Sequence, residues 1–173
     1  MGRVTDLYDD HRITGLGLLV EAYAGIMARV GSQLAAHGVA SAEFEVLIRL
    51  TRSPGQALRM TDLAAQTTLT ASGITRVVDR LEQAGLVARE ACGTDRRGMF
   101  ARITDRGLSR VDQILPGHVA IIDTWLFAPL SDAQQSDMLS ALRTVRDRVR
   151  PGSVAGADRR PFPRIVAPAP ATA

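Results

Sequence analysis

A chain of 173 residues is the size of one domain with a short tail, and its 46% hydrophobic and 23% charged residues exclude wholesale disorder. Aromatic residues make up only 4%, so the core must rest on Leu, Val, Ile and Ala, which favours helices over sheets. The single cysteine, Cys92, excludes a disulfide framework and a cysteine-rich metal site. The N-terminus lacks a signal-peptide pattern and no uncharged run is long enough to cross a bilayer, which predicts a cytoplasmic protein with no membrane partner.

The net charge is +3, and all 21 basic residues are arginine. Two explanations account for the absence of lysine, and we favour codon bias. The alternative is selection for guanidinium groups, which bind phosphate and guanine. Residues 151–173 contribute +2 of the total through three arginines and one aspartate. Because the remainder is nearly neutral, net charge alone does not predict nucleic-acid binding.

The first 55 residues predict two helices. Apolar residues at steps of three and four predict a long helix over 16–34, which ends at His37-Gly38. Ser41 is the expected N-cap of a second helix, and Ser53-Pro54-Gly55 ends it. The predicted inner faces are Leu16, Leu19, Val20, Tyr23, Met27, Val30 and Leu34 in the first helix, and Phe44, Leu47, Ile48 and Thr51 in the second.

The central part predicts helix, turn, helix and β-hairpin. Thr61 is the expected cap of a short helix over 61–66, and Thr70 caps a further helix over 71–84 that ends at a left-handed Gly85. Alternating residues predict strands over 86–91 and 99–104, joined by a polar loop over 92–98. The helix over 71–84 is expected to bury Ile74, Val77, Val78 and Leu81.

Two more helices are predicted before the tail. One runs over 105–126 with a bend at Pro116-Gly117, and a capping box of Ser131 and Gln134 opens the other. The expected inner faces are Leu108, Val111, Leu115, Ile122, Trp125 and Leu126, followed by Met138, Leu142, Val145 and Val149. The long apolar stripes at the two ends of the chain either pack on each other within a monomer or are buried together in a symmetric dimer, and we favour the dimer.

The outward face of the helix over 71–84 carries side chains that donate to phosphates and base edges: Ser72, Thr75, Arg76, Asp79, Arg80 and Gln83. Gly73 lacks a side chain in the first turn, so a backbone amide can approach a phosphate there. A solvated polar face is the alternative interpretation.

The hairpin loop carries Asp95-Arg96-Arg97 directly after this helix. An arginine on a narrow β-ribbon can enter the minor groove, and a nearby carboxylate can orient it. A turn made soluble by charge is the alternative. Two elements suited to adjacent grooves together favour DNA binding.

The order of these segments resembles the MarR family of winged helix-turn-helix transcription regulators from about residue 44 to residue 111. The matching stretches are Phe44–Leu47, Thr61–Ala64, Thr75–Val87, the D-x-R wing at Asp95–Arg97, and Ile103-Thr104 followed by Gly107. Each is weak alone, but their order is specific.

The resemblance implies a mainly α fold with a small β-hairpin wing, an α+β winged helix-turn-helix with N- and C-terminal dimerisation helices. The expected parts are a dimerisation helix over 1–40, the DNA-binding unit over 41–104, dimerisation helices over 105–150 and a disordered tail over 151–173. A homodimer of this kind reads a pseudo-palindromic operator on double-stranded DNA, with half-sites about 10 base pairs apart. Family members mostly repress genes, and many release DNA when a small phenolic or anionic effector binds.

These expectations give each DNA-binding residue a role. Thr70 caps the recognition helix, and Ser72, Gly73 and Thr75 contact phosphates and bases near its N-terminus. Arg76 is the first candidate for base readout, and Arg80 holds the DNA backbone. By the D-x-R motif, Arg97 is the minor-groove arginine, with Arg96 a second candidate and Asp95 a support for the wing.

Other functions have less support. Cys92 could make the protein redox-responsive, but an incidental small residue is favoured. His11, His37 and His118 lack metal-binding spacing, and neither a cofactor nor a catalytic pair is indicated, so an enzyme is not predicted. Trp125 is expected to pack in a dimer core rather than line a ligand site. A winged helix used for protein contact is the other class, and four arginines oppose it: Arg76, Arg80, Arg96 and Arg97.

Overall fold

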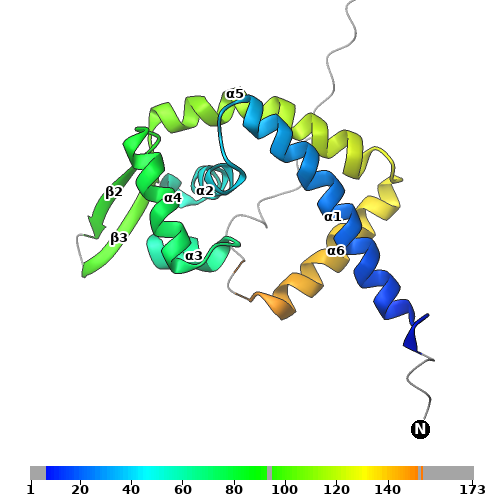
Figure 1. Ribbon diagram of the computed structural model, residues 1–173. Coiled ribbons are helices and arrows are strands. Elements are labelled where there is room, and N and C mark those ends of the chain that lie inside the picture. Colours follow the sequence, from blue (N-terminus) through cyan, green and yellow to red (C-terminus); the bar gives the residue numbers. More distant parts are fainter. Residues whose placement is uncertain (1–6, 93–94, 152, 154–173) are drawn as a thin grey trace, which may run out of the picture.

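The computed structural model of the chain describes residues 7–92, 95–151 and 153 (Figure 1). The order of helices and strands confirms the predicted winged helix-turn-helix pattern. Their bounds are α1 His11–Ala36, α2 Ser41–Thr51, β1 Ala57–Arg59, α3 Met60–Gln66, α4 Ala71–Gln83, β2 Val87–Cys92, β3 Asp95–Ile103, α5 Asp105–Ile122 and α6 Asp132–Val149.

Helix α1 is longer than its apolar stripe predicts. Asp10 caps it by accepting a hydrogen bond from the amide of Arg12 at 2.8 Å, and the helix begins at His11, five residues before the predicted start. The predicted end is confirmed: His37 is the C-cap, and Gly38 follows with φ of +65°, where glycine avoids the steric cost of a side chain.

Two predicted helix caps are wrong by one or two positions. Ala40, not Ser41, is the N-cap of α2; it has no side-chain acceptor, and its amide donates instead to the Glu43 carboxylate at 3.0 Å. Arg59, not Thr61, is the N-cap of α3. In both cases a short polar residue inside the first turn was mistaken for the cap, because the preceding residues carry no capping side chain.

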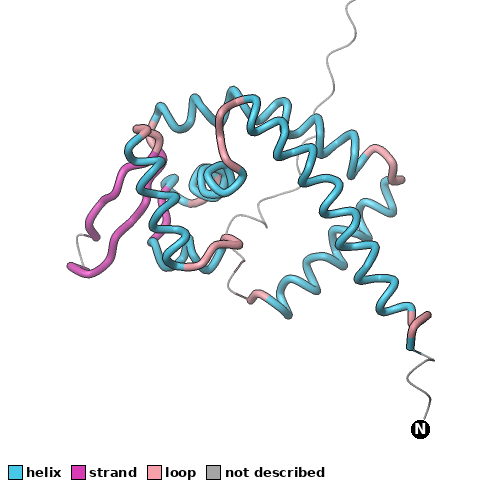
Figure 2. The backbone as a smooth tube through the Cα atoms, viewed as in Figure 1, coloured by secondary structure: helices cyan, strands magenta, loops and turns pink. Residues whose placement is uncertain are grey.

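The sheet has three antiparallel strands in the order β1-β3-β2. Strand β1 was not predicted, because three residues are too few to show an alternating pattern. Its central residue, Leu58, is buried and pairs with Ala101 of β3. The β2–β3 hairpin extends from one end of the molecule, while α1 and α6 lie toward the other (Figure 2).

The core of the winged unit is formed by apolar side chains from α2, α3, α4 and the sheet. The four predicted inward residues of α4 are all buried, which confirms the helical spacing, and Gly85 ends the helix with φ of +70°. A smaller cluster joins α1, α2 and α5 through Val30, Leu34, Val39, Phe44 and Ile114.

Helix α5 continues without a break through Pro116, where a bend was predicted. The departure from α-helical geometry comes later, in a π-helical turn over Asp123–Phe127. The chain then reverses, and α6 lies at 101° to the preceding helix. The capping box of α6 is confirmed: Ser131 accepts from the Gln134 amide at 3.3 Å, and Gln134 accepts from the Ser131 amide at 2.9 Å.

The apolar stripes of α1 and α6 are not buried within one chain. In α1 only Val30 and Leu34 are buried, and α6 has no buried residue, so the alternative in which the two faces are buried within a monomer is wrong. The exposed side chains are Leu16, Leu19, Val20, Tyr23, Leu142, Val145 and Val149. Trp125 is also half exposed, with the guanidinium carbon of Arg29 3.9 Å from its ring centroid.

Helix α1 passes a test of length and composition for a membrane span, with a mean hydropathy of 1.4. Glu21 and Arg29 interrupt its apolar sequence. A helix that is covered by another protein chain has the same composition. Residues 152 and 154–173 of the predicted tail lie outside the described part of the chain. The prediction that the tail over 151–173 is disordered therefore concerns mainly residues that the structure does not describe.

Candidate nucleic-acid interface

Helix α4 has one buried apolar face and one exposed polar face. Ile74, Val77, Val78 and Leu81 are between 0% and 4% exposed and pack on the core. The opposite face is open to solvent except for Asp79, which is half-buried, and it carries Ser72, Thr75, Arg76, Arg80 and Gln83. The helix thus presents hydrogen-bond donors along a surface that the core holds in place.

The first turn of α4 is organised by Thr70. Its hydroxyl accepts a hydrogen bond from the Gly73 amide at 3.1 Å and lies 3.2 Å from the Ser72 hydroxyl. A Cβ at Gly73 would lie 3.2 Å from the same Thr70 oxygen. The predicted cap at Thr70 is therefore confirmed. The close Thr70 oxygen also explains why a residue without a side chain stands at position 73, besides the expected approach to phosphate.

The central residues of the exposed face differ in their contacts. The Arg76 side chain is exposed and makes no hydrogen bond or ion pair with any other described residue. The hydroxyl of Thr75 donates to the carbonyl oxygen of Ala71 at 3.2 Å. Within the described chain, the Arg76 guanidinium retains its hydrogen-bonding capacity for an external partner.

Arg80 is ion-paired with a residue that sequence reasoning missed. Its Nε donates to Glu43 Oε1 at 2.9 Å, and the two side chains are 55% and 19% exposed. The other oxygen of Glu43 accepts from the amide of Ala40 at 3.0 Å. Glu43 thus orients Arg80 from the start of α2. No sequence signal links two residues 37 positions apart.

Arg89 of β2 fixes the wing to the recognition helix and was also missed. Its guanidinium lies 2.6 Å from the Asp79 carboxylate and 2.7 Å from the Glu82 carboxylate, and it donates to the Thr75 carbonyl oxygen at 3.3 Å. The Arg89 amide also donates to Glu82 at 3.1 Å. One arginine therefore forms ion pairs with two carboxylates beside the exposed face of α4 and offsets one of their two negative charges.

The wing is longer than predicted. Asp95, Arg96 and Arg97 were expected in a loop over 92–98, but their backbone belongs to β3. Pairing along the hairpin is irregular: Ala91 pairs with Met99, whereas Cys92 pairs with Asp95. Residues 96–98 thus form a bulge near the tip, which alternation alone does not reveal. The side chains over 92–98 lie outside the described part of the structure.

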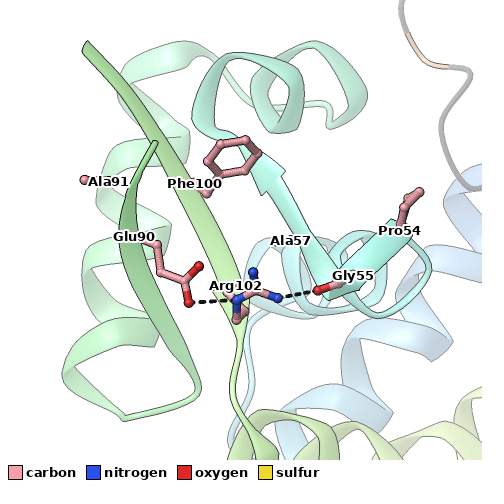
Figure 3. A pocket seen from close by; sticks show the side chains of 7 residues that line it. All are labelled: Pro54, Gly55, Ala57, Glu90, Ala91, Phe100 and Arg102. Carbon is pink, nitrogen blue, oxygen red and sulfur yellow. Dashed lines mark hydrogen bonds and ion pairs between the residues drawn. The ribbon is translucent and has the colours of Figure 1, made fainter. Parts of the chain in front are cut away.

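A depression of about 320 Å³ lies at the base of the wing (Figure 3). Arg102 crosses it, donating to Glu90 at 2.7 Å and to the Gly55 carbonyl oxygen at 2.5 Å. Because its charged groups partner each other, we assign no ligand to it. The residues that line it are Pro54, Gly55, Ala57, Glu90, Ala91, Phe100 and Arg102.

Within the described residues no group of three or more His, Cys, Asp or Glu side chains could hold a metal ion. His118 lies on α5, with its ring centroid 4.6 Å from that of Phe44. Partial burial lowers the pKa of His118 below its ordinary value of 6.5.

An exposed polar helix behind a short turn, with a β-hairpin beside it, defines the class of winged helix-turn-helix proteins. The model of the MarR family matches residues 37–98. The transcriptional regulator MhqR of Bacillus subtilis is 38% identical over 106 residues, which cover 61% of this chain and 72% of MhqR. The chain belongs to the MarR family and is a helix-turn-helix transcription regulator.

Two solved structures are similar to this chain over about four fifths of its length. Sco3205, a MarR family regulator of Streptomyces coelicolor solved in complex with DNA, is 32% identical with a TM-score of 0.74 over 80% of this chain and 87% of its own. CouR of Rhodococcus jostii, solved with bound p-coumaroyl-CoA, is 25% identical with a TM-score of 0.67 over 80% of this chain and 93% of its own. These similarities confirm the predicted fold class.

Proposed function

We propose that this regulator binds a pseudo-palindromic operator on double-stranded DNA as a homodimer. Helix α4 enters the major groove and the β2–β3 hairpin lies over the adjacent minor groove. The observation that carries the proposal is the exposed face of α4, where the Arg76 side chain makes no hydrogen bond or ion pair with another described residue while the opposite face packs on the core. The DNA complex of Sco3205 supports it.

We assign the DNA contacts by position on this surface. Arg76 reads a base, with guanine as the natural target of a guanidinium fork. Arg80, oriented by Glu43, holds the DNA backbone, and Ser72 and Thr75 contact phosphates and bases near the start of α4. On the wing, Arg97 enters the minor groove, Arg96 is the second candidate there, and Asp95 supports the strand. Thr70 and Gly73 maintain the first turn of α4.

A second copy of the chain is the proposed cover for α1 and α6. Leu16, Val20 and Tyr23 are 55–63% exposed, and Val145 on α6 is 55% exposed. Exposed apolar area of this extent marks an interaction surface. A two-fold interface buries both faces at once and spaces two α4 helices for successive major grooves. The dimer-forming parts are residues 1–40 and 105–150, and the DNA-binding unit is 41–104.

The regulator represses transcription until a small molecule lowers its affinity for the operator. The support is CouR, whose structure contains p-coumaroyl-CoA. The protein acts where the chromosome is, in the cytoplasm, and the proposal assigns it no catalytic step. Thermal shift and DNA-binding measurements with p-coumaroyl-CoA, p-coumarate and simple phenolic acids test this part.

The main test is selection of bound fragments from random duplex DNA by the purified chain, followed by measurement of stoichiometry. We expect an enriched motif with two-fold symmetry and two chains per duplex. No enrichment over scrambled competitor at moderate salt, with or without the small molecules, would overturn the proposal.

A further inference from the structure

The C-terminal end of α6 contacts the winged unit at the turn in front of the recognition helix. Arg150, the C-cap of α6, donates from Nη2 to the carbonyl oxygen of Thr67 at 2.5 Å and to that of Ala65 at 3.3 Å. Ser153 is 6% exposed, and its hydroxyl lies 3.5 Å from the same Ala65 oxygen. The contact joins the last helix to the helix-turn-helix across more than 80 residues of chain.

The accepting carbonyls belong to the end of α3. This helix ends at Gln66, and the carbonyl groups of a last helical turn lack partners within the helix. A guanidinium there satisfies them and interacts favourably with the negative end of the helix dipole. Thr67 is fully buried, and its hydroxyl donates to the Leu63 carbonyl at 2.9 Å. Arg150 therefore acts as a C-terminal cap of α3, supplied by a distant helix.

The same turn is held from its other side by α2. The amide of Thr68 donates to Glu45 Oε1 at 3.1 Å, and its hydroxyl donates to Glu45 Oε2 at 3.0 Å. Thr70 then starts α4. Glu45 belongs to the winged unit itself, whereas Arg150 comes from α6, one of the proposed dimerisation helices. Both residues hold the turn, but only the contact of Arg150 makes its conformation depend on the position of α6.

Charges of both signs lie close to this contact. Burial, together with the positive charges of Arg52, Arg150 and Arg146, lowers the pKa of Arg49, and Glu45 offsets part of the effect. The Arg150 guanidinium therefore docks near other guanidinium groups and near the Glu45 carboxylate, so that repulsion from the arginines opposes the attraction of Glu45 and the bonds to two carbonyls. A contact with opposing contributions opens at smaller free-energy cost than the core does.

We propose that Arg150 is a positioning residue for DNA binding, which fixes the turn before α4 from the end of α6 and so couples the dimerisation helices to the recognition helix. The proposal rests on the function proposed above, in which α4 reads the operator. Because the contact is shared, displacement of α6 loosens the turn, and DNA held by α4 in turn stabilises the docked α6.

The test compares three variants of the full chain. Arg150→Gln removes the positive charge and the planar guanidinium donors, whereas Arg150→Lys keeps the charge alone. Arg148→Gln is the matched control, since Arg148 is exposed in the last turn of α6. Hydrogen exchange of the DNA-free protein reports on the amides over 67–73. Affinity is measured for a duplex selected by the wild-type chain and for a scrambled duplex.

We expect Arg150→Gln to speed exchange over 67–73 by about threefold or more while exchange in α2 and α5 stays unchanged. Affinity for the selected duplex should fall about five- to tenfold, beyond the smaller effect of Arg148→Gln, and Arg150→Lys should recover part of it. Equal exchange in Arg150→Gln and Arg148→Gln overturns the proposal, as does faster exchange with equal affinities. If the wild-type chain selects no duplex, the DNA-binding function itself fails, before any variant is compared.

Discussion

The hydroxyl of Thr104 donates a 2.8 Å hydrogen bond to the carbonyl oxygen of Gly85 and thereby connects the start of α5 to the end of the recognition helix. The amide of Thr104 donates to the Leu86 carbonyl at 3.0 Å, and its hydroxyl accepts from the Gly107 amide at 3.0 Å. This is the physical content of the Ile-Thr-x-x-Gly pattern: one threonine caps a helix and fixes the end of another.

Gly107→Ala should destabilise the winged unit. A Cβ at this position would lie 2.2 Å from the Leu86 carbonyl oxygen and 2.6 Å from Ile103 Cγ1, so the backbone must move. We expect a loss of about 1–3 kcal/mol in the free energy of unfolding, measured by urea denaturation. Gly17→Ala is the control, because nothing lies within 4 Å of its added methyl group, and an equal loss there would contradict this explanation.

Arg76→Ala should relax sequence preference at one position of each half-site. The Arg76 guanidinium, which has no hydrogen-bond or ion-pair partner among the described residues, is the natural base-reading group of α4, and its loss should cost about 1–3 kcal/mol of operator affinity. Repeating the DNA selection with the variant shows which position loses information. Arg76→Lys keeps the charge but not the fork and should show the same relaxation with less loss of affinity. An unchanged motif in Arg76→Ala would refute the assignment.

Val20→Glu should dissociate the proposed dimer. Val20 is 55% exposed in the apolar stripe of α1, and a carboxylate buried there between two chains would be unpaired. Sedimentation analysis should find the variant as a folded monomer. Leu18→Glu is the matched control, since Leu18 is 62% exposed and helical spacing places it on the other side of α1. A stable Val20→Glu dimer would exclude this face as the interface.

Acidification should destabilise the fold through His118. Burial lowers its pKa in the folded protein below 6.5, so the unfolded chain binds the proton more readily. The contribution of neutral His118 to the free energy of unfolding is complete above about pH 6.5. It is lost as the pH falls through that value toward the pKa of His118 in the folded protein. His118→Leu should flatten the dependence of the urea midpoint on pH between 7.5 and 5. His11→Gln, at a 92% exposed side chain, should retain the slope of the wild-type protein.

The winged unit was predictable because its signals are local. Four apolar residues at helical spacing, Thr70 before them and Gly85 after them define α4 by themselves. The errors are local as well: β1 is too short for a pattern, and the helix caps at Ala40 and Arg59 have no capping side chain.

The contacts that orient the candidate site were not predictable. Glu43 meets Arg80 across 37 residues, and Arg150 meets Thr67 across 83. Such pairs depend on how helices cross, which a single sequence does not encode as a spacing. The partly exposed face of α6 shows a related limit: periodicity identifies an apolar stripe but not which chain covers it.

The triple attachment of Arg89 to Asp79, Glu82 and Thr75 has a mechanical consequence. Because Arg89 connects strand β2 to helix α4 at this point, any tilt of α4 moves the β2–β3 hairpin with it. Helix α4 and the β2–β3 hairpin of one protomer thus approach a half-site as one rigid unit. In the proposed dimer, tolerance for operators of unequal length or curvature must therefore come from the relative orientation of the two copies.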